Sequence, residues 1–208
     1  MGAIVSLLWQ KCPEFGQVFL AHLVEKCPYM IGYFPVREKD DSEVSYLLAC
    51  GYVYGSDNET LETEESFLNR MRALTRLYAA IVQSSLGVDH PRGLGHAWTL
   101  VGRILNADPR PAITASVLHA FLTTALYRML ICYKTQMVKI VHFIQQDYLS
   151  RIESTSSKDV KKQSIVQLKM FVEDAMKKMR RNPNSIKPEG MIAEYFFQRQ
   201  YLHGASFR

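Results

Sequence analysis

Residues 64–86 read EESFLNRMRALTRLYAAIVQSSL, and this stretch decides the fold class. Its large apolar residues recur at intervals of three and four positions: Phe67, Met71, Leu74, Leu77, Tyr78 and Ile81. That interval puts them on one face of a helix. Thr63 can cap the helix, and Glu64 and Glu65 then occupy its first turn, where carboxylates favour the positive end of the helix dipole. The stretch predicts an amphipathic helix that packs against a core.

The helical period continues on both sides of this stretch. It predicts helices over 13–26, 94–106, 112–133, 136–152 and 156–181. Pro111 suits the first turn of a helix because its missing N–H needs no partner there, and Pro28 ends the helix before it. The segment 112–133 is apolar on most sides, which is typical of a buried helix.

About six helices with short connections and no alternating strand pattern predict an all-α fold. Successive amphipathic helix pairs favour a HEAT-like stack of antiparallel helices over a four-helix bundle. Residues 38–65 interrupt the pattern with nine carboxylates and one lysine, Lys39. We interpret them as an acidic, solvated surface loop with a brief helix around 46–48.

Composition narrows the class of protein. The chain has 208 residues, of which 48% are hydrophobic and 22% charged, as in globular domains. No apolar run approaches the roughly 20 residues of a spanning helix, so we expect no membrane span. Four cysteines without a C-x-x-C pair indicate reduced thiols. The net charge of +5 divides into −3 over residues 1–104 (9 basic, 12 acidic) and +8 over 105–208 (16 basic, 8 acidic), which suits an anionic partner.

Catalytic and metal signatures are weak. His90 and His96 stand six apart in a Gly/Pro loop, without the close ligand pairs of a zinc site, so a hydrolase built on that loop is the least favoured hypothesis. Cys27 ends a helix, where the dipole raises a thiol pKa. The basic run at 177–181 either meets the negative end of its helix dipole or binds an anion. The aromatic residues of the C-terminal half mostly fall on apolar stripes, so we predict no direct nucleic-acid binding. Because the catalytic and metal signatures are weak, we also predict no enzyme and no metal.

One segment is more specific. Residues 19–33, FLAHLVEKCPYMIGY, resemble a helix and turn in the C-terminal domain of the GLE-one family, the mRNA export mediators of the nuclear pore. Further blocks resemble the family in the same order: Gly51-Tyr52, 67–71 (FLNRM), 76–81 (RLYAAI), His90-Pro91, 93–98 (GLGHAW), 103–106 (RILN) and 146–152 (QDYLSRI). The agreement runs over roughly residues 7–176, and on it the chain is identified as a member of this family.

The resemblance implies a single α-helical C-terminal domain over 1–208 that lacks the first helices and the upstream coiled coil of the family. It implies a non-enzymatic activator of the DEAD-box ATPase of mRNA export, which promotes poly(A)+ mRNA export and ribonucleoprotein remodelling at the cytoplasmic face of the nuclear pore, in nucleus and cytoplasm. An FG nucleoporin and translation initiation and termination factors are the further partners it implies. The alternative is a docking scaffold for the FG nucleoporin without ATPase activation, because the chain is truncated; segment 195–201 is a candidate wall of its pocket.

In some family members inositol hexakisphosphate tethers activator and ATPase through clustered basic residues. The resemblance carries this cluster to His22, Glu25 and Lys26, which the i, i+3, i+4 spacing puts on one helical face. Lys26 matches, His22 stands where some members have arginine, and Glu25 stands where they have lysine. Val53 replaces another basic position. The implied inositol-phosphate site therefore rests on Lys26 and His22 and is degraded at Glu25 and Val53.

Overall fold

The computed structural model describes residues 2–55, 58–84, 92–155, 163–181 and 186. The regular elements among them are helices, and an isolated bridge joins Tyr54 to Leu61. In chain order these are α1 (Gly2–Lys11), α2 (Pro13–Lys26), the 3₁₀ turn η1 (Pro28–Ile31), α3 (Glu43–Ala49), α4 (Glu64–Val82), α5 (Leu94–Asn106), α6 (Pro111–Tyr133), α7 (Thr135–Phe143), the π-helical turn η2 (Ile144–Tyr148), α8 (Leu149–Thr155) and α9 (Gln163–Arg181). The predicted all-α class is confirmed.

Local signals set several helix ends. The Thr63 hydroxyl accepts a hydrogen bond from the Ser66 N–H at 3.3 Å, so α4 begins with the predicted cap. Ser42 caps α3 in the same way, at 3.1 Å from the Ser45 N–H. α2 and α5 have their predicted bounds. α4 ends at Val82, four residues before the predicted end, and the Ser84 hydroxyl just beyond it turns back to the Ile81 carbonyl at 2.7 Å.

The predicted helix over 136–152 is wrong as a single regular helix. It starts after Lys134, whose φ of +45° breaks the chain away from α6, and the turn η2 divides it into α7 and α8. Ile144 and Tyr148, the first and last residues of η2, are both fully buried. The predicted start of the next helix at 156 lies outside the described residues.

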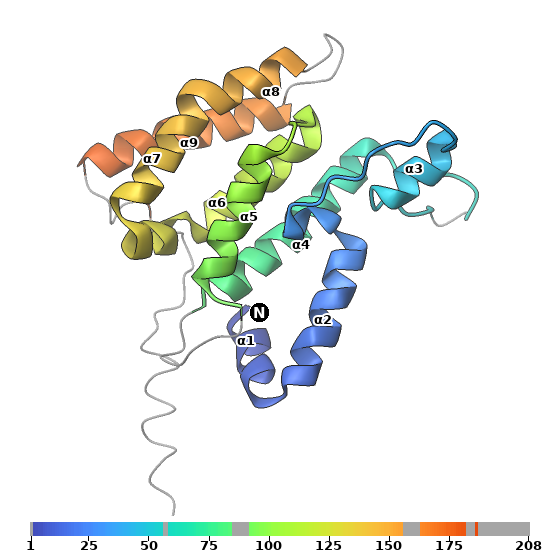
Figure 1. Ribbon diagram of the computed structural model, residues 1–208, viewed down its shortest axis with the longest axis horizontal. Coiled ribbons are helices and arrows are strands. Elements are labelled where there is room, and N and C mark those ends of the chain that lie inside the picture. The colour runs from blue at the N-terminus through green and yellow to red at the C-terminus, as the bar shows by residue number, and fades with distance from the viewer. Residues whose placement is uncertain (1, 56–57, 85–91, 156–162, 182–185, 187–208) are drawn as a thin grey trace, which may run out of the picture.

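The helices pack as a stack of successive pairs around α6 (Figure 1). α1 and α2 form a hairpin at one end, and α1 contacts α4. α6 contacts α4 and α5, and also α7, α8 and α9. α3 and the acidic loop lie at the edge of the molecule, beside α4 (Figure 1). The described part of the chain therefore agrees with the predicted stack.

α6 is the centre of the core. Its side chains from Ala115 to Met129 include nine apolar ones that are at most 1% exposed: Ala115, Val117, Leu118, Ala120, Phe121, Leu122, Ala125, Leu126 and Met129. By length and composition Ala112–Tyr133 is long and apolar enough to cross a membrane, so the expectation that no apolar run reaches that length is wrong. Over half of the most apolar stretch of this helix is buried inside the protein, because five helices cover it. Core packing accounts for its hydropathy.

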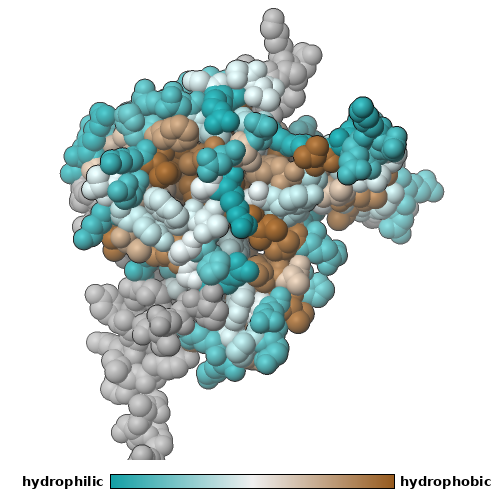
Figure 2. All heavy atoms as spheres, in the orientation of Figure 1, coloured by the Kyte–Doolittle hydropathy of each residue, from teal (hydrophilic) through white to brown (hydrophobic). Residues whose placement is uncertain are grey.

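The hairpin of α1 and α2 leaves large apolar side chains on the surface. Ile4 and Leu8 of α1 are 53% and 46% exposed, and Val18 of α2 is 59% exposed. Phe15 stacks on Phe19 with ring centroids 5.7 Å apart, at the edge of the same region. Figure 2 shows apolar surface on the side of the molecule where α2 lies.

Candidate functional site

The cluster expected on α2 is present on one face of the helix. The Glu25 carboxylate lies between its two neighbours, with Oε2 3.4 Å from Nδ1 of His22 and Oε1 3.0 Å from Nζ of Lys26. All three side chains are more than half exposed. The predicted i, i+3, i+4 arrangement is therefore confirmed as geometry.

Glu25 changes what this cluster can bind. The hydrogen bond from Lys26 and the charge of Lys26 lower the pKa of Glu25, and His22 lowers it further, so the carboxylate is ionised at neutral pH. The formal charges of Lys26 and Glu25 cancel. A polyphosphate needs several convergent cations, because its desolvation has to be offset by charge-assisted bonds. By themselves, the three side chains of this cluster therefore provide too few cations for inositol hexakisphosphate.

Arg70 of α4 joins three segments of the chain near the end of α2 through its hydrogen bonds. Its guanidinium donates to the Gly51 carbonyl at 2.7 Å and to the Lys26 carbonyl at 3.4 Å, and it pairs with Glu62. The end of α2, the turn at 51–53 and α4 thus meet at one arginine. Arg70 lies in the FLNRM block, but nothing in the helical period distinguishes it from a surface arginine, so sequence reasoning missed it.

Glu62 completes the junction from the acidic loop. Its Oε1 accepts the Val53 N–H at 3.1 Å, while its own N–H donates to the Val53 carbonyl at 3.0 Å. The Glu62 side chain is only 12% exposed, so the prediction that the loop's carboxylates are solvated is wrong for this residue. Val53, the other position that departs from the family's basic cluster, is linked to the Lys26 carbonyl by the hydrogen bonds of Glu62 and Arg70.

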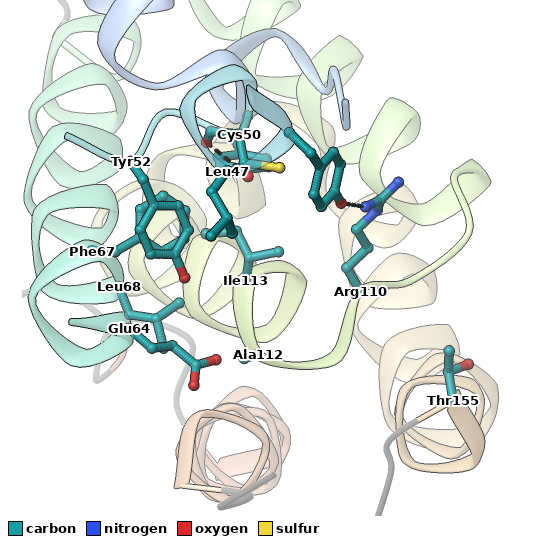
Figure 3. A pocket seen from close by; sticks show the side chains of 12 residues that line it. Leu47, Cys50, Tyr52, Glu64, Phe67, Leu68, Arg110, Ala112, Ile113 and Thr155 are labelled. Atoms are coloured by element: carbon teal, nitrogen blue, oxygen red, sulfur yellow. Dashed lines mark hydrogen bonds between the residues drawn. The ribbon is translucent and has the colours of Figure 1, made fainter. Parts of the chain in front are cut away.

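An apolar pocket of about 300 Å³ lies beside this junction, between α3, α4 and the start of α6 (Figure 3). Tyr52 stacks on Phe67 at one side, with ring centroids 3.9 Å apart and planes 9° apart. At the other side Arg110 donates a hydrogen bond to the Tyr46 hydroxyl (Figure 3). Burial is the main cause that raises the pKa of Tyr52 to about 12, so the side of the pocket formed by Tyr52 and Phe67 carries no charge. The pocket is suited to an apolar or aromatic side chain.

The described residues hold no cluster of His, Cys, Asp and Glu that could bind a metal ion. His96 lines a second cavity, where burial and then Arg92 lower its pKa, while His90 lies outside the described part of the chain. Cys27 is fully buried, 4.0 Å from the Thr75 hydroxyl. Its pKa is raised to about 11, as the sequence predicted in direction, but burial and not the helix dipole is the main cause.

Fold and surfaces together define a class: a domain of stacked helices whose pocket and exposed helix faces are suited to binding. The chain belongs to the family described as GLE1-like protein, whose model matches residues 1–145. It is 32% identical to mRNA export factor GLE1 of Rattus norvegicus over 203 residues, 95% of this chain and 28% of the relative. Its counterpart in Danio rerio is 36% identical over 73% of this chain and 22% of the relative. The chain thus spans about a quarter of the length of these relatives.

A solved structure confirms the fold. The complex of the S. cerevisiae Dbp5 C-terminal domain with Gle1 and IP6 matches with a TM-score of 0.71 at 22% sequence identity. The match covers 88% of this chain and 60% of that chain. The complex that contains a variant Gle1 matches with a TM-score of 0.72 at 23% identity. In both solved complexes, Gle1 is bound to Dbp5 in the presence of IP6.

Proposed function

We propose that this chain is a non-enzymatic activator of a DEAD-box ATPase in mRNA export, acting at the cytoplasmic face of the nuclear pore. Membership of the GLE1-like family over residues 1–145 carries the proposal, because the relatives are named mRNA export factors. The fold shared with a Gle1 bound to Dbp5 supports the choice of partner. Buried Cys27, with its raised pKa, offers no nucleophile.

Activation in this proposal runs through direct contact between the two proteins. The α2 face of His22, Glu25 and Lys26 is exposed, and the Arg70–Glu62 junction holds the end of α2 in place. Because Glu25 neutralises Lys26, this contact does not require a bound polyphosphate. We infer that any affinity for inositol hexakisphosphate resides in Lys26 and His22 and is opposed by Glu25.

The test is RNA-stimulated ATP turnover by the cognate DEAD-box ATPase while the chain is titrated in, with and without inositol hexakisphosphate. The wild-type chain should stimulate turnover equally in both series. Glu25→Lys should make stimulation rise with the polyphosphate, whereas Glu14→Lys, an exposed change in the first turn of the same helix, should not. A folded chain that gives no stimulation in either series contradicts the activator.

A docking scaffold for an FG nucleoporin is the second candidate, and the apolar pocket of Figure 3 is the observation that favours it. A phenylalanine ring would contact Leu47, Phe67 and Ile113 there. The wall predicted at 195–201 lies outside the described residues. Binding of a Phe-Gly repeat peptide that Leu47→Arg abolishes, without ATPase stimulation by the wild-type chain, would favour the scaffold. Translation initiation and termination factors are further proposed partners, testable by the same binding assay.

A further inference from the structure

A third cavity, of about 490 Å³, opens between α4, α6 and α9. Its lining residues are Asn69, Arg72, Arg76, His119, Gln167, Met170 and Phe171, which include no carboxylate. Arg72 and Arg70 are two positions apart, about 200° around the helix axis, so this groove lies on the side of α4 turned away from the junction at Lys26. We call it the arginine groove. Its lining residues lie on α4, α6 and α9, whereas the cluster of His22, Glu25 and Lys26 lies on α2.

Arg72 is held in the groove by neutral oxygens. Its guanidinium donates to the Asn69 side-chain oxygen at 2.9 Å and to the Ser164 hydroxyl at 2.7 Å. Ser164 is itself fixed by the buried Ser116 hydroxyl at 2.9 Å. Arg72 Nε is buried and has no hydrogen-bond partner, and among the described ion pairs none includes Arg72. Glu65, also on α4, acts on its charge without forming an ion pair. A partly buried cation without an ion-pair partner is costly, and a bound anion would reduce that cost.

Two further donors converge on Arg72. Arg76 follows one turn later on α4 and is exposed at the mouth of the groove. His119 comes from α6, and its Nδ1 is buried without a hydrogen-bond partner. Its ring forms a T-shaped contact with the ring of Phe171 of α9, with centroids 5.5 Å apart and planes 82° apart. Burial, then the charges of Arg76 and Arg72, lower the pKa of His119, so the imidazole is neutral at pH 7 and keeps one N–H to donate.

We propose that the arginine groove binds a small phosphate monoester, with the phosphoryl group on Arg72, Arg76 and His119. Two guanidinium groups balance the two negative charges of such a group, and the planar fork of arginine matches its oxygens. A carboxylate would leave one arginine unbalanced. The volume exceeds that of a phosphate ion alone, and Met170 and Phe171 form an apolar wall for the organic part of the ester.

The experiment is a titration of the full 208-residue chain with phenyl phosphate, inorganic phosphate and phenylacetate, followed by calorimetry and by the ring resonances of His119. We expect one phenyl phosphate per chain, weaker binding of inorganic phosphate, and none of phenylacetate. Arg72→Gln and Arg76→Gln should each weaken phenyl phosphate about tenfold, because each removes a charge-assisted bond. In the wild-type chain, bound phenyl phosphate should raise the pKa of His119 and shift its resonances.

Arg180→Gln is the matched control, because Arg180 is an exposed arginine in the last turn of α9. It should change binding by less than about twofold, as a screened surface charge does. Equal weakening in all three variants would mean unspecific attraction to the basic half of the chain and would overturn the site. Unchanged resonances of His119 at saturation would overturn it even if a variant failed to fold. A phosphoserine peptide that binds far more tightly than phenyl phosphate would overturn the small ester as the ligand.

Discussion

Replacing Arg70 with methionine should destabilise the chain and loosen the turn at 51–53 in particular. Methionine keeps the length and the apolar stem of the side chain, but it removes every donor. The change leaves the Gly51 carbonyl and the Glu62 carboxylate without their partner. Glu62 is mostly buried, so the loss is larger than for an ion pair on the open surface.

The size of the effect follows from the geometry. The bond to Gly51 at 2.7 Å is well formed and charged, which contributes about 1.5–3 kcal/mol. Discounted for exposure, the pair with Glu62 adds about 1 kcal/mol. The contact with the Lys26 carbonyl is long, at 3.4 Å, and adds little. A total of roughly 3 kcal/mol would lower the Tm of a domain of this size by about 6–12 °C.

Thermal melts and amide hydrogen exchange test this reasoning. Arg76→Met is the matched control, because Arg76 is an exposed arginine of the same helix. The Val53 amide, which donates to Glu62, should exchange faster in Arg70→Met, while amides of α6 keep their relative protection. Equal Tm values for the two variants, within about 2 °C, would refute the conclusion that the contacts of Arg70 stabilise the chain.

Three further outcomes follow from the core and the titrating groups. Leu122→Ala, at a fully buried position of α6, should cost about 2–5 kcal/mol in urea unfolding, since it leaves a cavity. The pKa of His119 is lowered in the folded chain, so on acidification the imidazole is protonated first in the unfolded chain. The free energy of unfolding should therefore fall as the pH drops below about 6.5, and it should fall less in His119→Gln. A thiol reagent should label exposed Cys12 and Cys132 quickly and buried Cys27 only on unfolding.

Each of these has its own check. Ile131→Ala, at a half-exposed position of the same helix, should cost far less than Leu122→Ala, and equal costs would contradict the placement of α6 in the core. A pH profile that is the same with and without His119 would show that its pKa is not lowered. Labelling of Cys27 at the rate of Cys12 in the folded chain would contradict its burial.

Helix positions were predictable because their causes are local. The apolar period and the caps act within one or two turns, and so α2 and α5 have the bounds read from the sequence. The shared face of the α2 cluster followed from spacing alone. The family was recognisable from ordered blocks of sequence, and the family model confirms it over residues 1–145.

The sites depended on contacts between distant residues. Arg70 joins Gly51 and Lys26, 19 and 44 positions away, and Arg72 reaches Ser164, 92 positions away. The helical period distinguished neither arginine from a surface arginine, and the sequence reasoning assigned Glu62 to a solvated loop.

The sequence by itself therefore determined where most of the helices lie, which faces are apolar and which family the chain belongs to. The tertiary structure alone decided which charges are paired, which are left in a groove and which carboxylate is buried. Helix formation needs only neighbours along the chain, whereas the partner of a charged side chain depends on how whole helices pack.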